Sequence, residues 1–558
     1  MSRNIFIITI LSSIVILISS CSTGDNNQSQ QITDTTTAKK LTITERLNEY
    51  AVIPLTSDLS KLSEKDKEML SLLINACKIM DEIFWMQAYG IKDSLYATLK
   101  NPEETKLCDI NYGPWDRLNS NEPFLENFDK KPIGAGFYPS NIKYLPFIDM
   151  KFEDKLSMYT VIKRAEDGSL FTQPYHIAYK EQLETAADFL KKAAKICDNK
   201  DFAKFLNLRA ESLLNDDYYT SEMFWMDMES NNIDLIIGPV ESEEDRFINS
   251  KTAYEAFLLI KDLEWSNKLK DYSSMVPEIK NQLPLDDLYK NQIVFTKTNI
   301  GVYDAIFYSG YANAGAKNIS INHPKDGRIL MEKGSKKMQF KNAMKAKFDK
   351  ILQPISNILI SENERKNIKF DAFFINNVNY EIADAIVVKT TVNNKGPVKE
   401  ALKDYYPTIN SLKADILNLY IISKLHEKGV IKEVELLDNY VIFMSNILRS
   451  VRFGATYSQG SSNIICFNVL QEMQAFTRDE KTGTYSVNLE KMKSSIEKFS
   501  VEIMRILAEG DYAAAKDIIE NKGNMLPTLQ EDLKRISSAG IPTDITFEQG
   551  EQVLGLTK

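Results

Sequence analysis

Apolar residues recur at three- and four-residue spacing along most of the chain, which is the pattern of amphipathic helices. This spacing predicts helices in residues 66–83, 179–196, 253–269 and 496–507. Shorter apolar runs, three of them in a stretch rich in Gly, Asn and Tyr, predict strands in residues 233–240, 292–296, 302–309 and 319–321. We therefore expect a mainly α fold with a minor β component, in the α+β class.

One further predicted helix, residues 370–386, carries polar residues beside an apolar stripe. The apolar positions recur every fourth residue and predict a buried face formed by Phe370, Phe374, Val378, Ile382 and Ile386. This leaves Tyr380, Glu381 and Asp384 on the adjoining polar side. Because an α-helix repeats every 3.6 residues, Tyr380 and Asp384 are expected one turn apart.

The first residues of the chain have a different pattern. One positive charge at Arg3 precedes an almost wholly apolar run, residues 5–18, which is short for a membrane span but fits the core of a signal peptide. The run ends in Ile18-Ser19-Ser20-Cys21, the apolar-small-small-Cys pattern of a bacterial lipoprotein cleavage site. We expect a signal peptide over residues 1–21 and a lipid on the thiol of Cys21. A plain secretory signal and an uncleaved anchor are the alternatives.

Residues 22–40 contain almost no apolar side chains and predict a flexible polar tether. The body that follows, residues 41–558, is about 520 residues long and exceeds what one hydrophobic core usually serves, so we expect two lobes or more. No later apolar run is long enough to cross a membrane. The expected location is the bacterial cell envelope, with the membrane reached through the lipid on Cys21. Ser22 after the cysteine favours the outer membrane.

Charge and cysteine usage narrow the class of protein. A formal net charge of −9 and an isoelectric point near 5.3 argue against nucleic acid as a partner, because binding nucleic acid needs a basic stripe. The remaining cysteines are widely scattered and contain no CxxC pair: Cys77, Cys108, Cys197 and Cys466. Buried free thiols are therefore expected instead of disulfides or a cysteine metal site.

Histidine is scarce, which argues against a histidine metal site or a histidine-containing catalytic triad. The chain has His176, His323 and His426, which lie far apart in the sequence with no pair at helical spacing. A histidine metal site or a catalytic triad needs partners at suitable spacing. Structural roles are therefore expected for all three.

The polar side of the helix expected at residues 370–386 carries a five-residue stretch that can be compared with a zinc-peptidase motif. In His-Glu-x-x-His, two histidines one turn apart bind zinc, and the glutamate accepts a proton from the zinc-bound water. At the matching place this chain reads Tyr380-Glu381-Ile382-Ala383-Asp384. These five residues alone carry no specificity, so their surroundings decide the assignment.

The surroundings form a long series of motifs. They include FDAFF (370–374), NNKGPVKEALKDYY (393–406), KADILNLY (413–420), MDEIFWMQAYG (80–90), NNIDLIIGPVE (231–241) and VRFGATYSQG (451–460). Together these motifs resemble dipeptidyl peptidase III, and more narrowly its bacterial branch, whose zinc helix carries a five-residue motif. The similarity covers essentially the whole folded chain.

The resemblance implies two lobes around a wide peptide-binding cleft. A mixed α/β lobe is expected mainly in residues 41–262 and 301–348 plus the C-terminal tail. A helical lobe is expected mainly in residues 349–520.

The zinc ligands of the family do not carry over. By resemblance, Tyr380 and Asp384 stand where the family has its two zinc histidines, and Ser411 stands where the third ligand is a glutamate. Glu381, the position that activates the water, is retained. Asp415, on a second helix expected over residues 407–424, matches the acidic position that would orient a ligating histidine. Because Tyr380 is a poor zinc ligand and Ser411 scarcely binds a divalent ion, we expect no cofactor.

The peptide-binding positions are better preserved. By resemblance, Glu241 and Glu255 hold the free amino terminus of a peptide or shape the cleft, and Asn322 hydrogen-bonds the peptide backbone. Two departures are Lys325 in place of a second asparagine and Gln459 in place of a histidine that stabilises the transition state. A surface or structural role for the retained residues is the alternative.

Three functions stay open at this point. The leading hypothesis is a catalytically inactive envelope lipoprotein of the dipeptidyl peptidase III type that keeps its cleft for oligopeptides. The second is an active metallo-dipeptidyl peptidase or hydrolase with an altered metal site, for which zinc would be the cofactor and Glu381 would be required. The third is a non-catalytic scaffold or interaction protein that uses its surface instead of the cleft.

Overall fold

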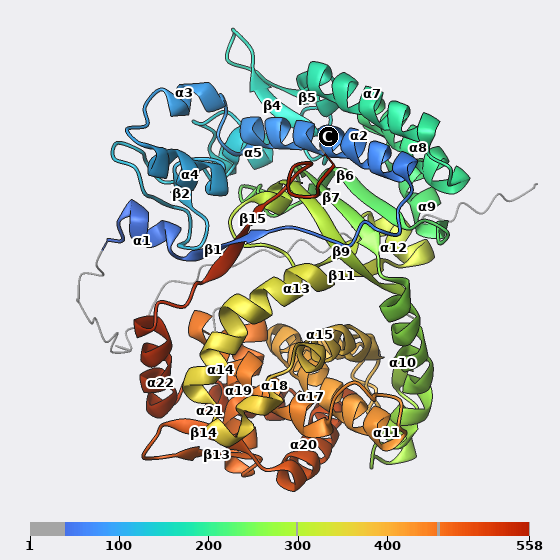
Figure 1. Cartoon of the computed structure of the whole chain (residues 1–558), viewed down its shortest axis with the longest axis vertical. Helices are drawn as coiled ribbons and strands as arrows, with labels where there is room; N and C mark the ends of the chain where they lie inside the picture. The colour runs from blue at the N-terminus through green and yellow to red at the C-terminus, as the bar shows by residue number, and fades with distance from the viewer. Residues whose placement is uncertain (1–39, 297–298, 455–457, 557–558) are drawn as a thin grey trace, which may run out of the picture. The chain divides into compact units, whose positions relative to one another are not determined.

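The computed structural model describes residues 40–296, 299–454 and 458–556. The expected signal peptide, the lipidation site Cys21 and residues 22–39 of the expected tether lie outside this part of the chain. From Thr42 onward the chain forms one compact unit. Its buried apolar side chains form two large groups, one around a five-stranded sheet and one around a set of packed helices. Figure 1 shows this sheet and, below it, the helices.

The five-stranded sheet has the strand order β10-β11-β9-β7-β6. Its strands are β6 (Ile233–Glu241), β7 (Ala253–Lys261), β9 (Asn299–Gly310), β10 (Ser320–His323) and β11 (Lys336–Phe340). Neighbouring strands are antiparallel except β11 and β9, which are parallel. β10 is therefore an edge strand, and its Asn322 lies opposite Lys337 of β11. Helix α2 (Glu64–Ala88) packs on β7 and β9, and α7 (Lys180–Ile196) packs on α2 and α8 (Lys200–Asn215).

The inner strand β7 corrects one prediction. The spacing in residues 253–269 predicts a single helix, whereas the structure has β7 followed by helix α10 (Leu263–Asn281). β7 lies between β6 and β9, and its first seven residues are buried. A strand covered on both faces is apolar at consecutive positions, and such a run also satisfies helical spacing. The helix begins only after Asp262, whose side chain accepts a hydrogen bond from the backbone N–H of Trp265.

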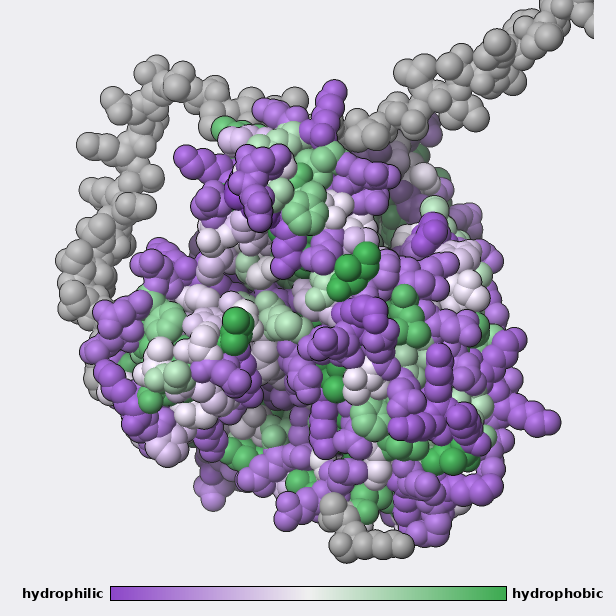
Figure 2. Space-filling model, turned by 90° about the horizontal axis from the view of Figure 1, so that it is seen from above, coloured by the Kyte–Doolittle hydropathy of each residue, from purple (hydrophilic) through white to green (hydrophobic). Residues whose placement is uncertain are grey.

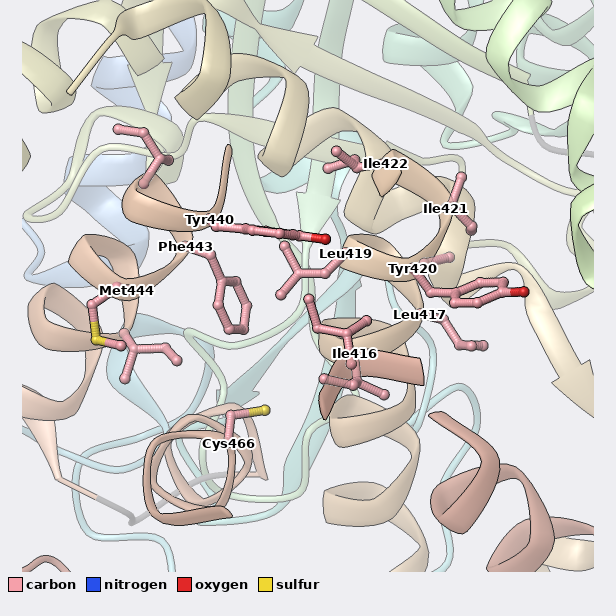
Figure 3. Close-up of a cluster of buried hydrophobic side chains, with 14 of the residues drawn as sticks. Ile416, Leu417, Leu419, Tyr420, Ile421, Ile422, Tyr440, Phe443, Met444 and Cys466 are labelled. Carbon is pink, nitrogen blue, oxygen red and sulfur yellow. The ribbon is translucent and has the colours of Figure 1, made fainter. Parts of the chain in front are cut away.

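The helical part is built around α17 (Tyr406–Glu427). Helices α15 (Phe370–Asp384), α19 (Ser458–Glu472) and α20 (Leu489–Glu509) pack on α17, and α18 (Leu436–Ser450) packs on both α15 and α17. Figure 3 shows part of the apolar core between these helices, with Leu419 of α17, Tyr440 and Phe443 of α18, and Cys466 of α19. The site described below is carried by α15 and α17.

Helix α15 ends earlier than its sequence pattern predicts. The apolar stripe continues to Ile386, but the helix ends at Asp384 and Ile386 begins strand β12 (Ile386–Val388). β12 pairs with β8 (Ile293–Phe295). The other stripe residues are buried as predicted, except Phe370, which is partly buried.

The chain contains further short elements. The helices are α1 (Ile43–Leu47), α3 (Lys92–Tyr96), α4 (Pro102–Asn111), α5 (Tyr144–Asp149), α6 (Tyr175–Ala178), α9 (Tyr219–Asp227), α11 (Asp287–Lys290), α12 (Gly327–Lys333), α13 (Lys341–Lys347), α14 (Gln353–Leu359), α16 (Val398–Leu402), α21 (Tyr512–Lys522) and α22 (Pro527–Ser538). Antiparallel strand pairs are β2 (Trp115–Asp116) with β3 (Glu122–Pro123), β4 (Thr160–Arg164) with β5 (Leu170–Pro174), and β13 (Phe476–Asp479) with β14 (Thr484–Val487). β1 (Tyr50–Pro54) pairs in parallel with β15 (Asp544–Glu548), which joins the beginning and end of the described body.

These elements confirm the predicted fold class, mainly α with a minor β component. Of the described cysteines, Cys77, Cys108 and Cys466 are buried free thiols as predicted, and Cys197 is free but only partly buried. No described helix is both long and apolar enough to span a membrane. Figure 2 shows one face of the molecule as largely hydrophilic, with hydrophobic side chains in small separate groups.

The histidines lie apart and contact structural partners. His176 Nδ1 lies 2.7 Å from Asp216 Oδ2, and His426 Nε2 lies 2.8 Å from Asn439 Oδ1. His323 Nε2 lies 3.3 Å from the carboxylate of Glu222. A histidine paired in this way is held in one orientation by its partner.

Candidate functional site

Helix α15 is fixed against α17 and α18 by buried amides. Asn439 Nδ2 donates to Asn376 Oδ1 and Asn376 Nδ2 donates to the carbonyl of Asn439, both at 2.9 Å. Asn418 Nδ2 donates to the carbonyl of Asn376 at 2.8 Å, and Asn379 Nδ2 donates to Asn418 Oδ1 at 2.9 Å. A buried polar network of this kind specifies one arrangement of its elements. The polar side of α15 is therefore presented at a defined place.

A lysine ammonium lies against this polar side. Lys337 Nζ is 2.7 Å from Glu381 Oε2 and 3.4 Å from Asp384 Oδ2, and it donates to the carbonyl of Glu381 at 3.3 Å. The side chains of Lys337 and Glu381 are 12% and 17% exposed. Glu381, which by resemblance is expected at the water-activating position, thus has a cation bound to its carboxylate.

A second lysine, Lys413 of α17, caps the end of α15. Its Nζ donates to the carbonyls of Asp384 at 3.0 Å and Ile386 at 2.6 Å, and to Asn410 Oδ1 at 3.1 Å. A cation near the last carbonyls of a helix offsets their partial negative charge. The side chain is buried, and this burial lowers the pKa of Lys413 to about 8.

The other end of the five-residue motif is tied to α19. Tyr380 Oη donates to Gln459 Oε1 at 2.8 Å, and Gln459 Nε2 donates to both carboxylate oxygens of Asp415 at 3.0 Å. Ser462 Oγ also donates to Asp415, at 2.5 Å. Burial raises the pKa of Asp415 to about 7 and raises that of the Tyr380 phenol above its ordinary value. A cavity of about 250 Å³ is lined here by Tyr380, Asp415 and Gln459 together with asparagines of α15, α17 and α18.

The residues at the three ligand positions do not fit a zinc ion. The Tyr380 phenol donates a hydrogen bond to the amide oxygen of Gln459, Asp384 faces two ammonium groups, and Ser411 offers a hydroxyl. Zinc takes thiolate, imidazole or carboxylate ligands, three of them from the protein in a catalytic site. Within residues 40–296, 299–454 and 458–556, no three His, Cys, Asp or Glu side chains are grouped as metal ligands would be.

The two glutamates predicted to bind a peptide lie together on β6 and β7. Glu241 Oε1 accepts hydrogen bonds from the backbone N–H groups of Ser242 and Glu243, and its Oε2 lies 3.3 Å from Lys325 Nζ. Glu255 is fully buried, and neither of its carboxylate oxygens has a hydrogen-bond partner within the described residues. Burial, followed by the nearby charge of Glu241, raises the pKa of Glu255 well above its ordinary value.

Asn322 lies at the other predicted binding position, on the edge strand β10. Its side chain is exposed, and the residue pairs in register with Lys337. Residues directly opposite on neighbouring strands place their side chains on the same face of the sheet. Asn322 is therefore a neighbour of the lysine that contacts Glu381.

The structure thus gathers the predicted residues into two groups. The first group is the α15–α17 site, which contains Tyr380, Glu381, Asp384 and Asp415. Asn322 lies next to this site because it is the strand neighbour of Lys337. The second group consists of Glu241 and Glu255 with Lys325. Sequence reasoning missed Lys337 and Lys413. A lysine in the KAD stretch after Ser411 was a signal for Lys413, but nothing local in the sequence links Lys337 to α15.

Comparison with known proteins gives consistent matches along the chain. The family described as peptidase family M49 matches residues 162–382. The solved structure of DPP III from Caldithrix abyssi is 34% identical, covers 92% of this chain and 100% of its own, and has a TM-score of 0.86. The solved structure of dipeptidyl-peptidase III from Corallococcus sp. strain EGB is 29% identical, covers 91% of this chain and 96% of its own, and has a TM-score of 0.73. Nudix hydrolase 3 of Arabidopsis thaliana is 29% identical over 586 residues, 93% of this chain and 75% of that protein.

Proposed function

The chain belongs to peptidase family M49, the family of dipeptidyl peptidase III, and we propose that it is a catalytically inactive member of it. One observation carries this proposal: the ammonium of Lys337 lies 2.7 Å from the carboxylate of Glu381. A general base must reach the water whose proton it takes. In this chain the Lys337 ammonium is bound to one carboxylate oxygen of Glu381, and of the three ligand positions only Asp384 carries a zinc-binding group.

The test measures metal content and peptidase activity of the full-length chain purified in detergent. We expect no stoichiometric zinc and no release of dipeptides from a dipeptidyl arylamide, with the DPP III of Caldithrix abyssi assayed beside it for comparison. One zinc per chain, together with dipeptide release that Glu381→Gln abolishes, would overturn the proposal. That outcome would establish the alternative, a hydrolase with an altered metal site.

We propose that the retained binding function is for oligopeptides at the edge of the sheet. An edge strand such as β10 presents unpaired backbone groups to which an extended peptide can add. The exposed amide of Asn322 lies on this strand, and the buried carboxyl of Glu255 lies in the same sheet. A bound peptide should raise the melting temperature of the full-length chain. Asn322→Ala should reduce this rise, and no rise with any oligopeptide would favour a scaffold.

We also propose that the chain is an envelope lipoprotein, because the Ile-Ser-Ser-Cys run ends at Cys21 behind a signal-peptide core. The expected mature protein begins at a lipid-modified Cys21 and fractionates with the outer membrane. Mass spectrometry of the N-terminal peptide tests the modification, and Cys21→Ser should release the protein from membranes. A mature N-terminus elsewhere would refute this assignment.

A further inference from the structure

Glu381 and Asp384 form a pair of carboxylates that requires a cation. They are three residues apart on α15 and therefore lie on the same side of the helix. Both belong to its last turn, where the backbone carbonyls add partial negative charge. Two carboxylates that share a site repel each other unless a positive charge lies between them.

Lys337 supplies this positive charge. Its Nζ lies near three oxygens of α15: Glu381 Oε2 at 2.7 Å, the Glu381 carbonyl at 3.3 Å and Asp384 Oδ2 at 3.4 Å. An ammonium has three N–H groups, so the number of donors equals the number of oxygens that face it. The side chains of Lys337 and Glu381 are 12% and 17% exposed, which separates their contact from the mobile ion pairs of a protein surface, whereas that of Asp384 is 38% exposed.

Strand β11 delivers the lysine from the sheet. Side chains alternate along a strand, and Lys336 points to the opposite face, where its Nζ donates to the carbonyls of Trp225 at 2.6 Å and Met228 at 2.8 Å. Met338, the residue that follows Lys337 in the strand, is fully buried. β11 is also paired on both edges, with β10 and β9. The backbone at Lys337 is therefore held by its neighbours, independently of α15.

We infer that the ammonium of Lys337 is the resident cation of this site and that it excludes divalent metal ions from Glu381 and Asp384. An ammonium and a hard divalent cation compete for the same carboxylate and carbonyl oxygens, and their like charges prevent both from binding. Lys413 competes less well with a metal ion for the carboxylates, because its Nζ lies 4.0 Å from Asp384 Oδ1 and donates to backbone carbonyls instead. Without the charge of Lys337, two carboxylates and a carbonyl form an oxygen site for a partly hydrated metal ion.

The test measures Mn²⁺ binding to the full-length chain in detergent, by electron paramagnetic resonance of the free ion. Methionine keeps the length of the lysine stem and removes its charge. We expect Lys337→Met to bind one Mn²⁺ at least about tenfold more tightly than wild type, and Lys337→Arg to behave like wild type. Lys341→Met is the matched control, because it removes a lysine of the next element that pairs with Asp262 at 2.9 Å. It should leave Mn²⁺ binding unchanged.

Adding Glu381→Gln to Lys337→Met should abolish the gained site. Circular dichroism checks that each variant folds, and Lys337→Gln replaces Lys337→Met if the latter does not fold. A folded neutral variant that binds Mn²⁺ no better than wild type would overturn the inference. So would a wild-type chain that binds one Mn²⁺ through Glu381. The first result leaves catalytic inactivity untouched, whereas the second would also favour the altered metal site, and zinc content and dipeptide release then decide whether the chain is a hydrolase.

Discussion

Replacing Asp415 by asparagine tests whether burial governs the electrostatics of the site. Asp415 is 5% exposed and accepts hydrogen bonds from Gln459 and Ser462, yet burial raises its pKa to about 7. An aspartate in an unfolded chain has a pKa of about 3.9. Between these two values the native state holds a proton that the unfolded state has released.

The sign and size of the effect follow from this difference in bound protons. The free energy of unfolding should fall as the pH rises from about 4 to about 7, with a slope of up to roughly 1.4 kcal/mol per pH unit. Over the whole interval the ionisation of Asp415 costs roughly 4 kcal/mol. This stability is fully present below the unfolded pKa and is lost as the pH rises through the folded pKa. Asparagine has nearly the same shape and cannot ionise.

Urea denaturation followed by tryptophan fluorescence between about pH 5 and about pH 8 measures the effect, since unfolding free energies depend on pH through such groups. We expect wild type to lose more stability over this range than Asp415→Asn. Asp188→Asn, on the exposed side of α7, is the control and should follow wild type. Parallel curves for wild type and Asp415→Asn would show that the carboxyl ionises in the native state as it does in the unfolded chain.

Three further predictions follow from the same contacts. Tyr380→Phe removes a buried hydrogen bond and should lower the free energy of unfolding by about 1 kcal/mol, measured by urea denaturation; unchanged stability would contradict this. Because the pKa of Glu255 is raised by burial, wild type should lose stability as the pH rises through it, and melting curves of Glu255→Gln should lack this loss. Restoring the family ligands with Tyr380→His, Asp384→His and Ser411→Glu should give stoichiometric zinc only when Lys337→Met is added. Metal analysis of both variants decides this, and equal zinc in the two would show that the lysine does not interfere.

The helices around the site could be predicted because their buried stripes are local patterns. The stripe of α15 is buried largely as its four-residue spacing indicates. Its end could not be predicted, because Ile386 continues the apolar spacing while its backbone pairs with β8, far away in the sequence. Strand β7 was misread for a related reason, since burial on both faces removes the alternation that identifies a strand.

The sequence predicted the part of the candidate site that lies on α15 but not the lysine that contacts it. The spacing of Tyr380, Glu381 and Asp384 places them on adjoining parts of one helix, and the structure has them there. The lysine that contacts two of them comes from β11, and only the fold brings β11 and α15 together. A sequence shows which ligands are missing from a motif, whereas it does not show which distant side chain takes their place.

The parallel pair β1–β15 has a consequence for how each molecule is made. The backbone N–H of Leu55 donates to the carbonyl of Glu548, and that of Thr543 donates to the carbonyl of Glu49. During synthesis from the N-terminus, β1 emerges early and has no partner until β15 has also left the ribosome. A chain cut short before Asp544 keeps an unpaired strand, which exposes it to proteases and to aggregation. This pair therefore distinguishes molecules that contain β15 from truncated ones that lack it.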